Sequence, residues 1–566
     1  MARVVGIGHQ DFECVRVSDN FYIDKTHFIR EWWEANDAVT LITRPRRFGK
    51  TLTMSMVEQF FSVEYANRKE LFEGLSIWQE EAYRNLRGTY PVISLNFAKV
   101  KETSFLNTRK KICNIITKLY NRYDFLLDSG KLNGKEKELY QKVSADMEDY
   151  IASDSLNMLS DYLMRYYGKK VIILLDEYDT PMQEAYVGGY WEEMVEFIRN
   201  LFNATFKTNP YLERAIMTGI TRVSKESVFS DLNNLEVITT TSKKYADCFG
   251  FTEEEVFRSL DEYGLSTEKE EVKKWYDGFC FGGQKDIYNP WSILNYLDKK
   301  RVGLYWANTS SNSLVGKLIR EGEAGIKIRM EQLLQGESLY TVLDEQIVFN
   351  QLDQGEDAVW SLLLASGYLK AVYARFNTEC RKMEYELRLT NLEVQVMFEH
   401  MIEGWFQRCR PLNNAFLQAL TNGDLEEMND YMNDISEEMF SSFDTGKNPS
   451  EKTHPERFYH GFVLGLMVEL RGRYEITSNG ESGLGRHDVM IVPKEKNQDA
   501  YVIEFKVANT RKRESLESAV SSALEQIEKR KYESALRARG FAKEQIKKYG
   551  FAFRGKEVLI GAAEVG

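Results

Sequence analysis

In the N-terminal half of the chain, short runs of aliphatic residues alternate with longer segments whose apolar residues recur at helical spacing. Runs of about four to eight apolar residues are typical of buried strands, whereas one-sided spacing over a longer stretch is typical of amphipathic helices. The pattern predicts strands at 39–42, 90–97, 171–175 and 215–217, and helices at 105–125, 136–167 and 192–205. Residues 21–34 predict a short strand or turn followed by an amphipathic helix. Strands that alternate with helices favour an α/β fold with a parallel sheet.

The first aliphatic run leads directly into the loop RPRRFGKT, residues 44–51, and then into a helical segment. A strand, a loop ending in Gly-Lys-Thr and a helix form the layout of a phosphate-binding P-loop. Gly49 would let the backbone approach phosphate oxygens, Lys50 would reach the β- and γ-phosphates of ATP, and Thr51 would ligate Mg²⁺. The remaining residues of this predicted nucleotide-binding loop are Arg46, Arg47 and Phe48.

One residue departs from the usual P-loop pattern. The pattern GxxxxGK[ST] has Gly at the position of Arg44, and the additional arginines and proline make this loop stiffer and more basic than usual. The alternative interpretation is the N-terminus of a helix in an unrelated α/β unit.

A second motif favours the nucleotide site. The aliphatic run 171–175 ends in Asp176 and Glu177, which is the Walker B arrangement. Asp176 would hold Mg²⁺ through water and Glu177 would polarise the attacking water. Both would lie at a strand end, where α/β sheets open their ligand crevice.

The run 215–217 leads to Thr218, Thr221 and Arg222. Thr218 or Thr221 could sense the γ-phosphate, and Arg222 could stabilise charge in the transition state as an arginine finger does. The alternative for Arg222 is a salt bridge on the surface.

Several separated motifs together resemble one family. The motifs are TRPRRFGKT, LLDEYDTPM, GITRVSKESVFSDLNNLEV and KKWYDGFCFGG followed by IYNPWSILNYL. They resemble the bacterial AAA-ATPase-like proteins, which usually carry a PD-(D/E)XK-type nuclease domain at the C-terminus. The resemblance implies that Arg44 is a usual variant, that WYDGF and YNPWS are packing and turn segments, and that the role concerns foreign DNA or mobile elements.

The middle of the chain carries the least functional information. Residues 305–450 predict helices and a hairpin, and the acidic stretch at 421–440 favours a solvated helical face over a binding tail. We expect a P-loop AAA-like ATPase domain at 1–250, a mostly helical lid or connector at 251–445, and a PD-(D/E)XK nuclease-like α/β domain at 446–566.

The C-terminal region places charged residues on two predicted strands. Residues 456–470 predict a helix, 473–492 a hairpin whose last strand follows Asp488, and 499–507 the partner strand. Glu504 and Lys506 are two positions apart, so they point to the same face of that strand. This is the D…ExK layout of PD-(D/E)XK nucleases.

The chemistry of such a site fits these residues. Asp488 and Glu504 would hold one or two Mg²⁺ ions, which lower the pKa of a bound water and stabilise negative charge. Lys506 would orient or activate the nucleophile. Further residues expected at the site are His460, on the helix at 456–470, and Gln526 and Tyr532, which the resemblance places beside the site on one helix after Val520. The alternative for Glu504 and Lys506 is a salt bridge on the surface of a fold whose members can be inert.

Composition limits the setting and the partners. The net charge of -12 argues against a uniformly basic surface, but residues 501–566 contain 14 Lys and Arg against 9 Asp and Glu. A local patch for a phosphate backbone is therefore expected. The six scattered cysteines form no CxxC pair, which favours a cytoplasmic protein with reduced thiols and no zinc module. No apolar run reaches about 18 residues, so no membrane partner is expected.

These features together predict an Mg²⁺-dependent nuclease that is coupled to, or gated by, a P-loop ATPase. The expected cofactors are ATP and Mg²⁺, and the expected partner is nucleic acid, DNA in preference to RNA. A homo-oligomer is one possibility. The alternative is an ATP-dependent switch or scaffold whose nuclease-fold domain binds without cutting; a translocating motor ranks last because helicase motifs are absent from the sequence.

Overall fold

The computed structural model describes residues 2–563, except 208, 222–228, 230–231, 310–312, 344–355, 379–380, 406–409, 440–460, 463–464, 466–467, 471, 479–480, 483–484, 509–513 and 555. Contacts divide the chain into two compact units. The first comprises residues 1–310 and 340–394, and the second comprises residues 311–339 and 395–566. The domain boundaries expected from the sequence, at 250 and 445, stay a prediction.

A five-stranded parallel sheet forms the centre of the first unit, in the order β2-β3-β4-β1-β5. Because its strands are parallel, their carboxyl ends lie at one edge of the sheet. The register pairs Asn96 with Asp176 and Thr43 with Gly219 at this edge. The strands are β1 (Val39–Thr43), β2 (Val92–Asn96), β3 (Val171–Asp176), β4 (Leu212–Gly219) and β5 (Leu235–Ile238).

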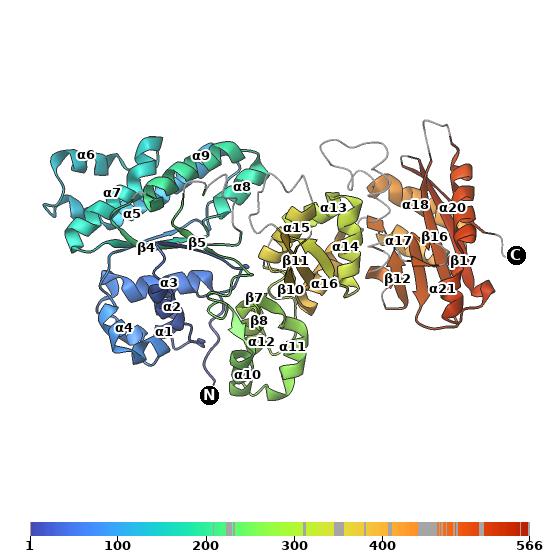
Figure 1. Ribbon diagram of the computed structural model, residues 1–566, viewed down its shortest axis with the longest axis horizontal. Coiled ribbons are helices and arrows are strands. Elements are labelled where there is room, and N and C mark those ends of the chain that lie inside the picture. Colours follow the sequence, from blue (N-terminus) through green and yellow to red (C-terminus); the bar gives the residue numbers. More distant parts are fainter. Residues whose placement is uncertain are drawn as a thin grey trace. The chain divides into compact units, whose positions relative to one another are not determined.

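Helices cover both faces of this sheet (Figure 1). One face carries α5 (Phe105–Arg122), α7 (Asp149–Tyr167) and α9 (Trp191–Phe202), and the other carries α2 (His27–Ala35) and α3 (Lys50–Phe61). Coverage on both sides explains why β1 and β3 are buried along their whole length and consist mostly of aliphatic residues. The remaining helices of this part are α1 (Phe12–Val17), α4 (Glu81–Leu86), α6 (Gly134–Lys142), α8 (Thr180–Gly188) and a π-helical turn at Asn203–Lys207.

A small lid follows the parallel sheet along the chain. Its three-stranded sheet has the order β6-β8-β7 and packs with three helices around a core that contains Val272, Tyr276 and Tyr288. The elements are β6 (Phe251–Thr252), α10 (Glu253–Glu262), α11 (Lys269–Tyr276), β7 (Phe279–Phe281), β8 (Gln284–Tyr288) and α12 (Pro290–Lys299). Tyr276 is fully buried and Asn289 caps α12, so WYDGF and YNPWS contribute packing and turn residues.

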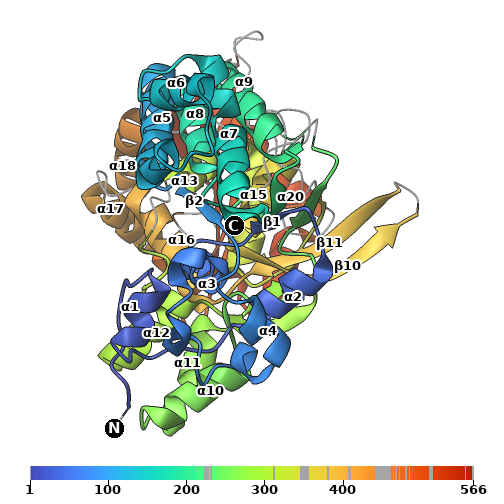
Figure 2. The same cartoon turned by 90° about the vertical axis from the view of Figure 1, so that its left-hand side faces the viewer.

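A third sheet, in the order β10-β11-β9, completes the first unit. Figure 2 shows β10 and β11 extending outward as a long two-stranded arm. The buried Glu393 accepts hydrogen bonds from Ser292 Oγ at 2.8 Å and from the Trp306 amide at 2.7 Å, which ties this region to the lid. The elements are β9 (Leu339–Val342), α15 (Glu356–Ala365), β10 (Leu369–Asn377) and β11 (Lys382–Leu389).

The second unit contains a five-stranded mixed sheet in the order β12-β15-β16-β17-β18. Among its described strands, β16 and β17 pair in parallel and the other neighbours pair antiparallel. The strands are β12 (Tyr474–Ser478), β15 (Val489–Pro493), β16 (Ala500–Val507), β17 (Ile546–Arg554) and β18 (Glu557–Ala562), with a short hairpin of β13 (Glu481–Ser482) and β14 (Gly485–Arg486). The helices are α13 (Ser313–Glu321), α14 (Ala324–Leu334), α17 (Arg410–Asn422), α18 (Leu425–Met439), α20 (Leu516–Arg530) and α21 (Glu533–Ala538), together with α16 (Leu392–Trp405), whose first three residues belong to the first unit.

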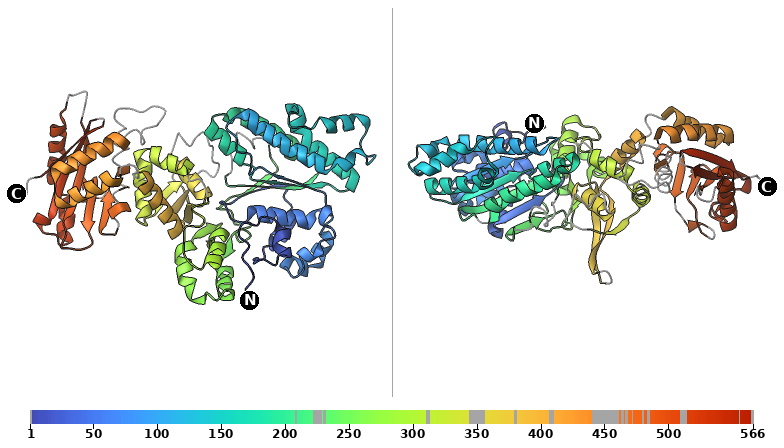
Figure 3. Two further views of the ribbon diagram at one scale, coloured as in Figure 1. Left: turned by 180° about the vertical axis from the view of Figure 1, so that it is seen from behind. Right: turned by 90° about the horizontal axis from the view of Figure 1, so that it is seen from above.

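The acidic helix α18 covers the exposed edge of this sheet. Asn433 exchanges two hydrogen bonds with the backbone of Val558, at 2.8 and 2.9 Å, and Asn429 does the same with Ile560 at 3.0 and 2.7 Å. These side chains satisfy backbone groups that an edge strand would otherwise offer to another chain. Figure 3 shows α17 and α18, in orange, over one face of the strands. The predicted solvated face is therefore one side of a packed helix.

The expected α/β fold class is confirmed, with a parallel sheet and a C-terminal mixed sheet. Two element predictions were wrong. The single helix expected at 136–167 is two helices, because the backbone of Val143 is extended and ends α6. Tyr532 does not lie on the helix that carries Gln526, because that helix ends at Arg530 and Lys531 adopts a left-handed conformation. Among the described helices, none is long and apolar enough to cross a membrane.

Candidate nucleotide and metal sites

The P-loop connects β1 to α3 with a left-handed turn at Gly49, where φ is +81°. A Cβ atom there would meet open space, so the positive φ, and not crowding, makes glycine suitable. Lys50 is 3 % exposed and its Nζ donates to the carbonyl oxygens of Arg44 and Pro45, at 2.9 and 3.0 Å. The ammonium group is therefore held against the inner side of the loop.

Asp176 accepts hydrogen bonds from side chains on three other segments. Its Oδ2 accepts from Thr51 Oγ1 at 2.8 Å and from Asn96 Nδ2 at 2.7 Å, and its Oδ1 accepts from Thr218 Oγ1. Burial raises the pKa of this carboxyl group above its ordinary value. The sequence did not identify Asn96, although a polar residue at the carboxyl end of the neighbouring strand was a usable signal.

Glu177 has a left-handed backbone, with φ of +55°. A non-glycine residue in this region is strained, and such strain is often found at functional sites. Its amide donates to Thr218 Oγ1 at 3.4 Å, and its Oε2 accepts from Thr180 Oγ1 at 3.3 Å. The turn directs Glu177 into the same cavity that Lys50 and Thr51 line.

Arg44 lies in the protein interior, away from the phosphate side of the loop. Its guanidinium donates to the carbonyl oxygens of Thr239 at 2.7 Å and Tyr245 at 3.2 Å, and stacks 4.7 Å from the centre of the Phe281 ring. Burial lowers its pKa to about 10. Arg44 therefore anchors the P-loop to the segment that follows β5.

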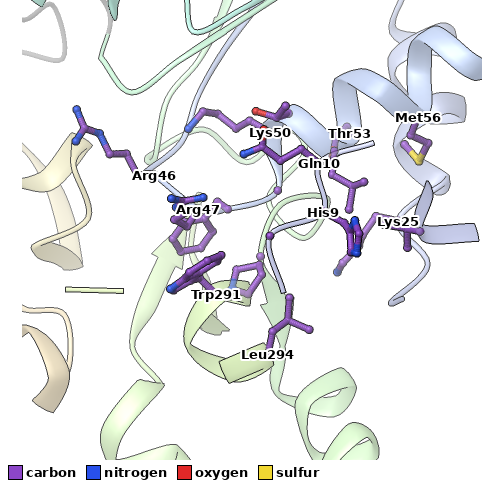
Figure 4. A pocket seen from close by; sticks show the side chains of 18 of the residues that line it. His9, Gln10, Lys25, Arg46, Arg47, Lys50, Thr53, Met56, Trp291 and Leu294 are labelled. Atoms are coloured by element: carbon purple, nitrogen blue, oxygen red, sulfur yellow. The ribbon is translucent and has the colours of Figure 1, made fainter. Parts of the chain in front are cut away.

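A cavity of about 370 Å³ extends from the P-loop toward the N-terminal segment and the lid. Arg47 and Trp291 face each other in this cavity, with the guanidinium 4.4 Å from the ring centre, whereas Arg46 extends away from them (Figure 4). Phe48 is buried against Phe279, so only its backbone can face a ligand. Sequence reasoning treated Trp291 as a packing residue, but it lines the cavity.

Asp179 organises the turn after β4. Its Oδ2 accepts from the amides of Ile220 and Thr221, both at 2.9 Å, and from Thr221 Oγ1 at 3.0 Å. Burial raises the pKa of Asp179. Thr221 is thus committed to this turn, while Thr218 contacts Asp176; Arg222 lies outside the described residues.

The second cluster lies on β15 and β16 of the C-terminal sheet. These strands are antiparallel, with Val489 paired to Ile503, so Asp488, immediately before β15, lies beside Glu504. Asp488 Oδ2 accepts from the Phe505 amide at 2.7 Å. Lys506 Nζ lies 3.3 Å from Glu504 Oε1. The expected hairpin and the shared face of Glu504 and Lys506 are therefore present; His460 lies outside the described residues.

Gln526 connects this cluster to α20. Its Oε1 accepts from Lys506 Nζ at 2.7 Å, and its Nε2 donates to Glu504 Oε1 and lies 3.2 Å from the Tyr532 hydroxyl. Tyr532 in turn donates to the carbonyl oxygen of Arg486. The helix and the β13–β14 hairpin thus hold the charged groups of β16 in fixed positions.

The donor set fits a divalent cation. Glu504 is 1 % exposed, and its Oε2 is buried without a hydrogen-bond partner among the described residues. Burial, and then the charge of Asp488, raise the pKa of Glu504 to about 7. Two adjacent carboxyl groups with one unused buried oxygen suit a hard cation such as Mg²⁺.

Comparisons with known proteins identify the families of the two domains that contain these residues. Residues 6–229 match the AAA-ATPase-like family model, described as a predicted AAA-ATPase, and residues 454–563 match a model of the PD-(D/E)XK nuclease superfamily. A protein of Azotobacter chroococcum mcd 1, described as an uncharacterized protein in the vnfD 5' region, is 25% identical over 549 residues, which cover 94% of each chain.

The chain therefore combines an AAA-ATPase-like domain with a C-terminal domain of the PD-(D/E)XK nuclease superfamily, and the resemblance read from the sequence is confirmed. These families indicate ATPase and nuclease-type hydrolase chemistry. They generally use a nucleotide and a divalent metal, and a nuclease domain implies binding of nucleic acid.

Replacing Arg44 with Gly would restore the usual P-loop pattern but remove its buried guanidinium. We expect Arg44→Gly to lose about 3 kcal/mol or more of stability, since hydrogen bonds to a charged group contribute about 1.5–3 kcal/mol each. Affinity for ATP should not exceed that of the wild type. Chemical denaturation measures the first effect and binding of a fluorescent ATP analogue the second. Arg46→Gly is the matched control, and equal stability of the two variants would contradict the anchoring role.

The raised pKa of Glu504 predicts pH-dependent binding of a divalent cation. Below about pH 7 Glu504 is mostly protonated, so the cation must displace a proton. Affinity for Mg²⁺ should therefore fall about tenfold for each pH unit below 7 and level off above it. Calorimetric titrations of wild type and Glu504→Gln isolate this site by difference. If the difference in Mg²⁺ affinity between the two proteins stayed constant from acidic to alkaline pH, Glu504 would not be a ligand of the cation.

Proposed function

We propose that this protein is an Mg²⁺-dependent nuclease that acts on DNA, and that ATP binding or hydrolysis by the N-terminal domain of the same chain controls it. The observation that carries the proposal is the convergence of Asp488, Glu504, Lys506 and Gln526 on one site with an unused, buried carboxylate oxygen. Defence against foreign nucleic acid is the proposed setting, and the family resemblance supports it.

In the proposed ATPase, Lys50 exchanges its contacts with the loop carbonyls for the β- and γ-phosphates. Thr51 and Asp176, whose oxygens are 2.8 Å apart, would hold Mg²⁺, which neutralises phosphate charge when bound. Glu177 would accept a hydrogen bond from the attacking water. Thr218 would sense the γ-phosphate, because its hydroxyl contacts both Asp176 and the Glu177 amide. Arg222 remains the proposed arginine finger.

In the proposed nuclease, Asp488 and Glu504 would hold Mg²⁺, which lowers the pKa of a bound water and stabilises charge on the phosphate. Lys506 would orient the nucleophile and offset charge near the scissile phosphate. Gln526 holds Lys506 in place through a 2.7 Å hydrogen bond, so the ammonium reaches the phosphate from a fixed position.

Charge near this site supports a nucleic-acid substrate. Lys529, Arg530 and Lys531 are exposed at the end of α20, the helix that carries Gln526. Such side chains bind a phosphate backbone with salt-sensitive, sequence-tolerant affinity. Residues 511–513, a second basic run, lie outside the described residues.

Two variants test the nucleotide site. Lys50→Ala should lose ATP binding, because it removes the phosphate-binding ammonium, and Glu177→Gln should bind ATP but hydrolyse it at least about 100-fold more slowly. Steady-state phosphate release and nucleotide affinity distinguish the two effects. If Lys50→Ala kept its ATPase activity, the P-loop assignment would be wrong. If Glu177→Gln hydrolysed ATP at the normal rate, Glu177 would not be the residue that polarises the attacking water.

A cleavage assay tests the nuclease site. Purified protein with Mg²⁺ should cut linear or supercoiled DNA in a way that responds to ATP, and Lys506→Ala should lose at least about 100-fold in rate while still binding DNA. Lys496→Ala, an exposed lysine in the same domain, is the matched control. Cutting by Lys506→Ala at the wild-type rate contradicts the mechanism. An intact ATPase that cuts neither DNA nor RNA would favour a switch or scaffold.

A further inference from the structure

Four potential metal ligands from two separate segments converge beside the nucleotide cavity. His27 and Glu31 are one turn apart on α2, so they lie on the same face of that helix. Asp247 and Cys248 follow β5 in the segment that leads into the lid. The nearest ligand atoms of all four side chains lie within 4.8 Å of one another.

The distances between these atoms match the edges of a tetrahedral site. Cys248 Sγ lies 3.6 Å from Glu31 Oε2 and 3.9 Å from Asp247 Oδ1, and His27 Nε2 lies 3.8 Å from Asp247 Oδ1. Zinc bonds of about 2.0–2.3 Å at tetrahedral angles separate the ligand atoms by about 3.3–3.8 Å. The cluster thus needs only small movements to close around an ion.

Hydrogen bonds within the protein account for only part of this arrangement: the Cys248 thiol donates to Glu31 Oε2 and to Asp247 Oδ1. His27 Nε2 is buried and has no hydrogen-bond partner among the described residues, and its 3.8 Å separation from Asp247 exceeds hydrogen-bond length. The nearby Lys25 ammonium donates to the Asp247 carbonyl at 2.8 Å and to Glu255 at 2.7 Å. It therefore leaves the Glu31 and Asp247 carboxylates facing the thiol.

We propose that His27, Glu31, Asp247 and Cys248 form a structural site for a zinc-class transition metal. A buried thiol and an imidazole exclude Mg²⁺ and Ca²⁺ as preferred occupants, because these ions take oxygen ligands. Four protein ligands leave no open position, so the ion would have a structural and not a catalytic role.

The site would fasten the lid segment to the helix that precedes the P-loop strand. Phe28 on α2 already packs against Tyr245 and Phe249, with ring centres 5.1 and 5.4 Å apart. Cys248 and Lys25 both line the nucleotide cavity. An ion at this position would therefore stiffen one wall of the cavity independently of whether ATP is hydrolysed or DNA is cut.

Titration of the chelator-treated full-length protein with Zn²⁺ and Co²⁺ tests the proposal. We expect one equivalent to bind tightly, and Co²⁺ to give the near-ultraviolet charge-transfer band of a thiolate ligand. The band is specific, because the proposed P-loop and nuclease sites offer oxygen ligands. Cys248→Ser should abolish the band, and Cys280→Ser, a matched free cysteine, should retain it.

Glu31→Gln provides a second variant that leaves the buried thiol in place. Affinity for Zn²⁺ should fall more than about 100-fold, since even the outer-shell partners of a metal ligand contribute about 10–100-fold. Zn²⁺ should raise the unfolding temperature of the wild type but not of Glu31→Gln. No thiolate band in the wild type, or equal Zn²⁺ affinity in wild type and Glu31→Gln, would overturn the proposal.

Discussion

The shared carboxyl edge of the parallel sheet is the constraint on which the nucleotide site depends. Parallel strands must end together, so residues far apart in sequence reach the same place. Thr51, Asn96 and Thr218 thereby direct hydrogen bonds at the one carboxylate of Asp176. The strand order places β4 between β1 and β3, and this is why the P-loop and the acidic pair can share a cavity.

The P-loop keeps its attachment to the parallel sheet although Arg44 replaces the glycine of the usual pattern. Where the usual pattern has glycine, the chain turns an arginine inward and binds its guanidinium to carbonyl groups after β5. The backbone of Arg44 still donates to Gly219 at 3.2 Å, so the loop remains attached to β4. The two basic side chains therefore have different roles. Arg44 stabilises the fold, and Lys50 remains beside the turn at Gly49.

Predictions from the sequence were correct where the spacing of residues within one strand or run determined the geometry. A two-residue spacing put Glu504 and Lys506 on one face, and aliphatic runs identified β1 and β3. They failed where tertiary contacts decide. No local pattern shows that Trp291 would stack on Arg47 from a separate lid, or that His27 would meet Cys248 across more than two hundred residues.

The two carboxylate sites differ in how they are prepared for a cation. Both oxygens of Asp176 accept hydrogen bonds from the protein, so an ion that binds there must replace hydroxyl and amide donors. Glu504 instead keeps one buried oxygen unused while Lys506 and Gln526 occupy the other. Leaving a buried carboxylate oxygen without a partner is costly. The proposed nuclease site therefore has an oxygen free to receive a cation, whereas the proposed ATPase site would have to exchange hydrogen bonds for one.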